Sequence, residues 1–175
     1  NVYLGNGVRD KISSGSNLWF NTLNFTDQGG FRFVTTGTPI TLTLSNGITS
    51  DPSLSNLRFD VAQDVGLVIP TAQTWDLGSF GTATIHGQMT GSGNLTLVGL
   101  NEALILNNLS GFPSTYSGNL TLSSSATAAI GDSPTLVLWG AGSLGTGTIS
   151  FTNGGTLTTH ASPTITNSFI LNGGP

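Results

Sequence analysis

The chain has 175 residues, of which 37% are hydrophobic, 7% are charged and 25 are glycine. Its net charge is −4, it has no cysteine, and its basic residues (Arg9, Lys11, Arg32 and Arg58) all lie in the first third. The absence of cysteine excludes disulfide scaffolds, thiolate metal sites and thiol catalysis. So few cations cannot form the basic stripe that a nucleic acid or an anionic lipid surface requires.

The chain contains no run of about 18 apolar residues, so we expect no helix that spans a membrane. Residues Asn1–Gly7 do not resemble a signal peptide, so we expect a mature chain or a part of a longer one. The apolar residues are numerous enough to bury a sizeable core.

Short strands are predicted along the whole chain, because apolar and polar residues alternate with a period of two. No segment has the spacing of an amphipathic helix. Each strand would carry Leu, Ile, Phe or Val on one face and Thr, Ser or Asn on the other. In chain order, the predicted strands are Leu23–Phe25, Phe31–Phe33, Ile40–Leu44, Leu57–Val61, Leu95–Leu97, Leu104–Leu106, Leu120–Leu122, Leu136–Leu138, Ile149–Phe151, Leu157–Thr159 and Phe169–Leu171.

Glycine and asparagine mark the corners between these strands, because both residues tolerate the positive φ that tight turns require. Very short strands with such corners are typical of sandwiches, barrels and solenoids. The predicted corners are Gly29–Gly30, Ser45–Gly47, Gly91–Asn94, Asn153–Gly155 and Asn172–Gly174.

Three features favour a solenoid over a sandwich. The phrase Leu42–Thr49 is echoed by Asn94–Gly99, Gly118–Ser124 and Asn153–Thr159, at intervals of roughly 20 to 25 residues. The strands are short. Charged residues are nearly absent, as expected for coils stacked about 4.8 Å apart, because like charges in such coils would repel each other. We therefore predict an all-β fold, a parallel β-helix (β-solenoid) of about seven to eight short coils.

The N-terminal segment, residues 1–17, is expected to be poor in strands apart from Val2–Leu4. We predict that it caps the solenoid or reaches a neighbouring subunit, while residues 18–175 form the solenoid itself. No cap is recognisable in Asn1–Lys11 or in Phe169–Pro175, so we expect unpaired strand edges at both ends.

Several phrases follow one another in the order of a known repeat. The strand pair Leu23–Phe25 and Phe31–Phe33 comes first, followed by Gln73–Gly78, Gly91–Gly99, Ser114–Leu122, Gly142–Phe151 and Gly154–Leu157. In this order they resemble the autotransporter-associated β-strand repeats of bacterial surface proteins, over residues 18–158. The resemblance implies a right-handed β-helix, export from a bacterium and exposure at the cell surface. The chain departs from the pattern at Gly118–Leu120, where the family usually has Gly-Gly-Thr.

No catalytic, cofactor-binding or metal site is predicted. A carbohydrate-active β-helix needs several carboxylates in one groove, whereas most carboxylates here are isolated along the chain. Asp60 and Asp64 are the closest interior pair, and Arg58 shares the outward face of Asp60, so we expect a surface ion pair. The full set of carboxylates is Asp10, Asp27, Asp51, Asp60, Asp64, Asp76, Glu102 and Asp132.

The remaining candidates have structural interpretations. His86 and His160 lie far apart without an acidic partner at ligand spacing, so we expect polar surface or corner positions. Gly142–Gly147 lacks the lysine and the following helix of a phosphate loop, so it is expected to be a corner. Trp75 and Trp139 are predicted to fill the core, because each lies in an apolar strand, and stacking of aromatic residues on sugars is the alternative.

Taken together, these expectations favour a structural or adhesive bacterial cell-surface β-solenoid module that is not an enzyme. Two alternatives stay open: a subunit of a head-to-tail extracellular filament, and a carbohydrate-binding or carbohydrate-active β-helix. The expected partners are neighbouring coils of a larger chain, copies of the chain itself or surface glycans. No nucleic acid, membrane insertion or cofactor is expected.

Overall fold

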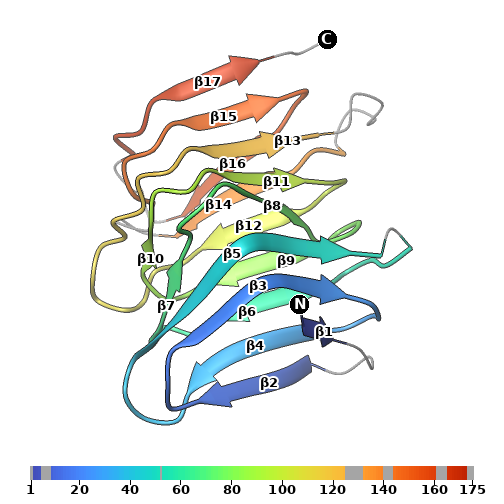
Figure 1. The fold of residues 1–175 in the computed structure, drawn as a ribbon. Coiled ribbons are helices and arrows are strands. Elements are labelled where there is room, and N and C mark those ends of the chain that lie inside the picture. Colours follow the sequence, from blue (N-terminus) through green and yellow to red (C-terminus); the bar gives the residue numbers. More distant parts are fainter. Residues whose placement is uncertain are drawn as a thin grey trace.

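The computed structural model describes residues 2–4, 9–51, 53–124, 132–139, 144–160 and 165–172 (Figure 1). Within these ranges the chain forms no helix, and hence none that could cross a membrane. The strands pair in parallel in two sheets, and successive turns stack along one axis. The prediction of an all-β parallel β-solenoid is confirmed, although the structure has about six turns and not seven to eight.

The first sheet contains 10 strands, and the second sheet contains 7. The path of the first sheet is β1 (Val2–Leu4), β3 (Leu18–Phe25), β5 (Ile40–Ser50), β8 (Gln73–Asp76), β11 (Leu95–Val98), β13 (Leu120–Ser123), β15 (Ile149–Thr152) and β17 (Phe169–Asn172), with β7 (Val65–Val68) and β10 (Met89–Thr90) beside it. The second sheet consists of β2 (Arg9–Ser14), β4 (Gly30–Thr35), β6 (Arg58–Val61), β9 (Thr82–Ile85), β12 (Ala103–Leu106), β14 (Thr135–Trp139) and β16 (Thr156–His160). Every strand predicted from the sequence overlaps one of these.

The turns are uneven in length, which explains the difference in their number. Side-chain hydrogen bonds between neighbouring turns join residues that are between 20 and 31 positions apart in the sequence. The predicted count assumes shorter and more regular turns, and it therefore gives too many coils.

Alternation along each strand builds the core. On β11 and β13, Leu95, Leu97, Leu120 and Leu122 point inward and are at most 1% exposed, while the threonines between them face outward. The parallel register keeps equivalent positions aligned, so Leu97, Leu122 and Phe151 form one inward row. The hydrophobic core is thus a set of rows that run along the solenoid axis.

Aromatic rings fill the interior of the N-terminal half. The ring centroid of Phe33 lies 5.8 Å from those of Phe20 and Phe59, and Phe59 lies 5.4 Å from Trp75. Tilted and edge-to-face contacts at these distances stabilise a core beyond the burial of area alone. Trp75 is fully buried, as predicted, and its indole N–H donates to Gln73 Oε1 at 2.9 Å.

The predicted corner at Ser45–Gly47 is wrong, because β5 continues through it. One extra residue of β5 is accommodated there, where its register with β3 shifts, and Gly47 has a φ of 104°. A Cβ on Gly47 would lie 2.1 Å from the carbonyl oxygen of Thr74, so the irregularity requires glycine. The first half of β5 pairs with β7 and the second half with β8. Glycine therefore bends this strand and does not end it.

The other predicted corners lie where they are expected. Gly29–Gly30 leads into β4, Gly91–Asn94 separates β10 from β11, and Asn153–Gly155 separates β15 from β16. The corner after Asn172 lies outside the described residues.

The N-terminal segment takes part in both sheets. β1 pairs with β3, and β2 pairs with β4. The expectation of few strands before residue 18 is therefore wrong for Arg9–Ser14. Ile12 is the one apolar residue of this strand, so alternation is not visible in its sequence. The role of residues 1–17 as a cap or a contact to another subunit stays a prediction.

Candidate functional site

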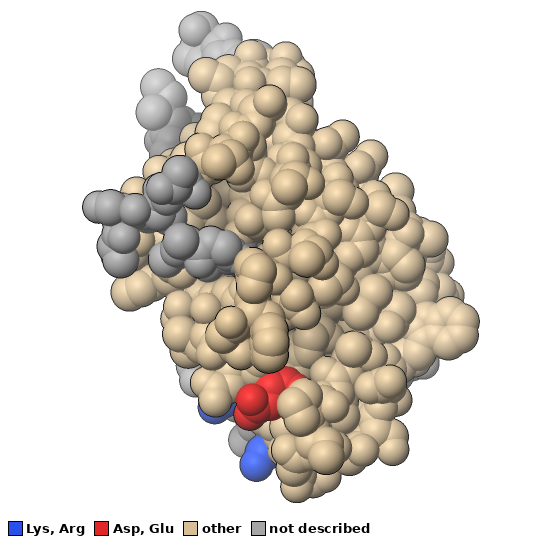
Figure 2. All heavy atoms as spheres, turned by 90° about the vertical axis from the view of Figure 1, so that its left-hand side faces the viewer, with Lys and Arg blue, Asp and Glu red and all other residues tan. Residues whose placement is uncertain are grey.

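The described cationic side chains of the molecule gather on the outward face of the second sheet. Lys11 on β2 is directly opposite Arg32 on β4, and Arg32 is directly opposite Asp60 on β6. Arg58 lies two residues before Asp60, on the same face of β6. In Figure 2 the coloured charged atoms are confined to the lower end of the face in view, and the described surface above them is neutral. The basic residues of the chain thus belong to the N-terminal turns, and the later turns have none.

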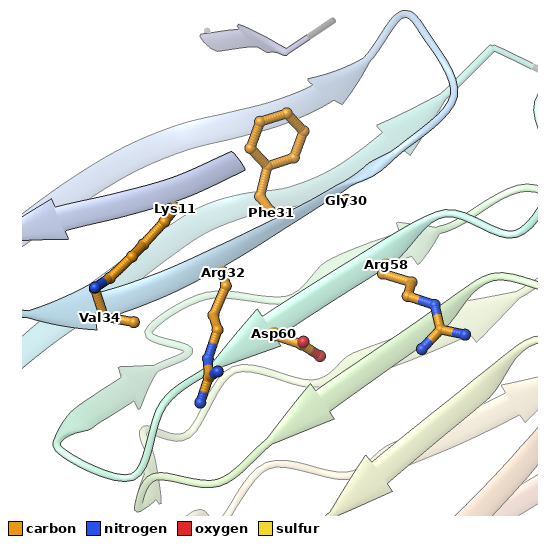
Figure 3. Close-up of a pocket in the computed structure, with 7 residues that line it drawn as sticks. All are labelled: Lys11, Gly30, Phe31, Arg32, Val34, Arg58 and Asp60. Carbon is orange, nitrogen blue, oxygen red and sulfur yellow. The ribbon is translucent and has the colours of Figure 1, made fainter. Parts of the chain in front are cut away.

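A groove of about 440 Å³ lies among these side chains (Figure 3). Arg32 and Arg58 are exposed, and the carboxylate of Asp60 lies between their guanidinium groups. Gly30 keeps the groove open, because a Cβ there would lie 2.7 Å from the Cβ of Arg58. The lining residues are Lys11, Gly30, Phe31, Arg32, Val34, Arg58 and Asp60.

The expected ion pair between Arg58 and Asp60 is not formed. Neither guanidinium group has a hydrogen bond or an ion pair within 4.0 Å to any other part of the chain that the structure describes. Residues i and i+2 on a strand are about 6.6 Å apart, so a shared face does not by itself bring two charges into contact. The donors of Arg32 and Arg58 are therefore open to solvent.

A second groove, of about 430 Å³, adjoins the first and shares Arg32 and Val34 with it. Asp64 lines this second groove, whereas Asp60 lines the first, so the closest interior carboxylates of the sequence face adjoining grooves. His86 Nδ1 is buried and has no hydrogen-bond partner among the described atoms. The other lining residues are Thr35, Ala62, Gln63 and Leu109.

The fold brings together a different pair of carboxyl groups, the buried Glu102 and the partly exposed Asp76. Glu102 is fully buried, and its Oε1 accepts a hydrogen bond of 3.0 Å from the backbone N–H of Leu77. The backbone N–H of Gly78 donates to Asp76 Oδ1 at 3.0 Å. Gly99 leaves room for the glutamate, since a Cβ there would lie 2.0 Å from Glu102 Oε1.

Burial, together with the nearby Asp76 carboxylate, raises the pKa of Glu102 to about 9, although the hydrogen bond from the Leu77 N–H acts in the opposite direction. Glu102 is therefore protonated at neutral pH. This pair was not predicted from the sequence, because its members lie one turn apart in the chain. The signal that could have found it is their separation, which is close to the length of one coil.

The aromatic residues divide between the core and the surface. Trp139 is 43% exposed, so the prediction that it fills the core is wrong. Leu136 and Leu138 take the inward positions of β14, and alternation then turns Trp139 outward. Its indole ring stacks on the imidazole of His160 with a centroid distance of 3.9 Å. His160 thus has the predicted surface position.

Two further predictions concern loops and metal ligands. Gly142 and Ser143 lie outside the described residues, while Gly145 and Gly147 lie in the segment that leads into β15. Within the described ranges, no three His, Asp or Glu side chains come together as a set that could hold a metal ion.

An apolar groove of about 530 Å³ lies at the C-terminal end of the solenoid, at the top of Figure 1. Leu171 on β17 is directly opposite Phe151 and extends the inward row of Leu122 and Phe151. Leu122 is fully buried and Phe151 is 7% exposed, whereas Leu171 is 78% exposed. The groove is lined by Phe151, Gly154, Gly155, Leu157, Phe169 and Leu171.

The described residues thus form a charged groove at one end, a carboxyl pair with a buried Glu102 in the middle and an exposed apolar row at the other end. The resemblance of the sequence to autotransporter-associated repeats stays a prediction. Comparisons of the chain with protein-family models, with curated proteins and with solved structures found no match.

Proposed function

We propose that the chain is a structural or adhesive β-solenoid module, exposed at a bacterial cell surface, and that it is not an enzyme. The observation that carries the proposal is the open end of the core at β17. Leu171 occupies a row whose earlier members are covered by the following turn, and none of the described residues forms such a cover over Leu171. A further coil stacked on β17 would bury this row in the same way.

The free energy available from such stacking is substantial. The side chains of Phe169 and Leu171 are 43% and 78% exposed, and β17 leaves one edge without a partner strand among the described residues. Full burial of one large apolar side chain stabilises a structure by about 1.5–3 kcal/mol. An unpaired parallel edge also offers its backbone N–H and C=O groups to a further strand. Extension of the rod is therefore the favoured use of this end.

A role without catalysis is supported by where the carboxyl groups lie. In the carboxyl pair that the fold assembles, Glu102 is fully buried, where a substrate would not reach it, and Asp76 is partly exposed. Among the described residues, Asp60 is the one carboxylate that lines the charged groove, whereas hydrolysis of a glycoside uses two. A structural role needs only the shape and stiffness of the stack.

Surface exposure is supported by the outward rows of the sheets and by the resemblance described above. Thr96 on β11 is directly opposite Thr74 and Thr121, so neutral hydroxyl side chains stack along the outer face of the first sheet. Such rows avoid the repulsion that stacked like charges would produce.

The test is negative-stain electron microscopy of the native material, with the length of each particle recorded. We expect straight rods, because each turn adds about 4.8 Å along the same axis. Irregular particles without a long axis would contradict the proposal.

A second candidate is a filament in which the covering coil belongs to another copy of the chain. The same open row at β17 favours it. At the other end, the edge strand β2 carries Arg9, Asp10 and Lys11, and charged residues on an edge oppose pairing with a further strand. Long uniform threads in the micrographs would favour the filament, and short rods would favour a module within one chain.

A further inference from the structure

We propose that the groove over β2, β4 and β6 binds an extended anionic polysaccharide, through charge-assisted hydrogen bonds from Lys11, Arg32 and Arg58 to its carboxylate or sulfate groups. The inference rests on the adhesive role proposed above and names the ligand class for it.

The basic residues of the chain cluster on β2, β4 and β6. Lys11 and Arg32 are directly opposite each other on neighbouring strands, where like charges destabilise a sheet. Arg9 and Arg58 flank Gly30 in the same register, so every basic residue of the chain lies on these three strands. On β9, the next strand of the same sheet, the outward positions carry the neutral residues Thr82 and Thr84. A bound anion would offset the repulsion that the cluster creates.

The guanidinium groups of Arg32 and Arg58 are free to bind a ligand. The guanidinium groups of Arg32 and Arg58 are exposed and have no acceptor within the described part of the chain. Arginine presents paired N–H donors that match the two oxygens of a carboxylate or sulfate. The donors flank one groove of about 440 Å³, so a single ligand can reach both (Figure 3).

The carboxylate of Asp60 favours an acidic polysaccharide over a ligand with a phosphate at every unit. It lies between Arg32 and Arg58, and it would repel a ligand with a phosphate at every unit, as would the net charge of −4. A sugar hydroxyl, by contrast, can donate a hydrogen bond to this carboxylate. A ligand that carries widely spaced anionic groups together with hydroxyl groups fits both features, and an acidic polysaccharide has this composition.

The adjoining groove indicates that the ligand is extended. It continues from Arg32 and Val34 for about another 430 Å³, toward Gln63, Asp64 and His86. These side chains can donate and accept hydrogen bonds with hydroxyl groups. Together the two grooves give room for more than one sugar unit.

The experiment measures binding of the full chain to hyaluronate and to κ-carrageenan, which carry one carboxylate and one sulfate per disaccharide, and to neutral dextran, by calorimetry at low salt. The variants are Arg32→Gln, Arg58→Gln and the double variant. Thr74→Glu is the matched control, because it lowers the net charge by the same amount on the exposed outer face of the other sheet. We expect each single variant to weaken binding at least about tenfold, and the control to change it less than about twofold. Binding should also weaken as salt is added.

Several results would overturn the inference. These are no binding of either charged polymer, equal binding of neutral dextran, undiminished binding by the double variant, or equally tight binding of single-stranded DNA. Binding of one charged polymer alone would identify carboxylate or sulfate as the group recognised. If the rods are seen by microscopy but no polysaccharide binds, the ligand class fails while the structural function stands.

Discussion

Asn56, Phe80 and Asn101 occupy equivalent positions, each two residues before a strand of the second sheet. Their φ angles are 56°, 59° and 57°, which places all three in the left-handed region. Asparagine tolerates this region, whereas for an L-residue with a bulky side chain it costs about 1–2 kcal/mol. Phe80 gains little burial in return, because its side chain is 57% exposed. The corner at Phe80 is therefore a local weakness of the stack.

We expect Phe80→Asn to raise the free energy of unfolding by about 1 kcal/mol, because asparagine relieves the strain at this corner. Urea denaturation followed by circular dichroism measures the change. Phe112→Asn is the control, since Phe112 is 69% exposed and does not have a positive φ. An equal gain in both variants would mean that loss of an exposed aromatic side chain, and not relief of strain, is the cause.

The raised pKa of Glu102 leads us to expect an unusual dependence of stability on pH. The folded chain holds this proton up to about pH 9, whereas an unfolded glutamate releases it near its ordinary pKa of 4.5. Between these values the folded state binds more protons than the unfolded state, so the free energy of unfolding falls as pH rises. From this group alone, the slope is about 1.4 kcal/mol per pH unit.

Glu102→Gln removes the titration and keeps the oxygen that accepts from Leu77. We expect the variant to lack most of the decline between pH 5 and 8, and to be more stable than the native chain at pH 8. Denaturation at a series of pH values measures both effects. Asp64→Asn serves as the matched control at an exposed carboxylate and should keep the native slope. If Glu102→Gln keeps that slope as well, another group is responsible.

At the scale of elements, the corners before the strands of the first sheet depend on close stacking. A Cβ on Gly118 would lie 2.1 Å from the carbonyl oxygen of Gly93, and a Cβ on Gly147 would lie 1.8 Å from that of Gly118. The neighbouring Asn119 N–H donates to Asn94 Oδ1 at 3.0 Å. Glycine and asparagine thus set the distance between neighbouring turns here.

We expect Gly118→Ala to lower the free energy of unfolding by at least about 2 kcal/mol, because the methyl group would force the turns apart. Gly37→Ala provides the comparison, since no atom lies within 4 Å of the position of its Cβ. Its effect should stay within about 0.5 kcal/mol. Thermal unfolding of the two variants and the native chain decides the matter, and a similar loss in both would contradict the role of close stacking.

The elements that alternate clearly could be predicted from the sequence. Strands such as β11 and β13 place leucine inward and threonine outward, so the pattern alone locates them. β2 could not be found in this way, because its six residues include one apolar side chain. The path of β5 depends on contacts between Gly47 and the following turn, which no local pattern contains. Trp139 shows that hydrophobicity misleads where alternation assigns the outer face.

At the scale of the molecule, the candidate site depends on which residues of successive turns become neighbours. The sequence shows that the basic residues lie early in the chain, but not that Lys11, Arg32 and Asp60 form one row. Turns of unequal length prevent a register from being counted along the sequence. The same holds for Asp76 and Glu102, which meet because one turn brings them together.

The open end at β17 leads to a prediction about association. Leu171 extends the inward row of Phe151, whereas its neighbour Ile170 lies opposite Ser150 on the outer face. If another copy of the chain covers this end, association depends on the inward residue much more than on the outward one. Both side chains are exposed in this structure, at 78% and 45%, so neither substitution should destabilise the fold.

We expect the native chain to associate with increasing concentration in sedimentation velocity, and Leu171→Lys to abolish this association, because it places a charge in the apolar row. Ile170→Lys introduces the same charge at the adjacent position of the same edge strand and should leave most of the association intact. An equal loss in both variants would mean that a charge anywhere on the edge prevents pairing, and that the row contributes little. A native chain that stays monomeric at high concentration would exclude the filament.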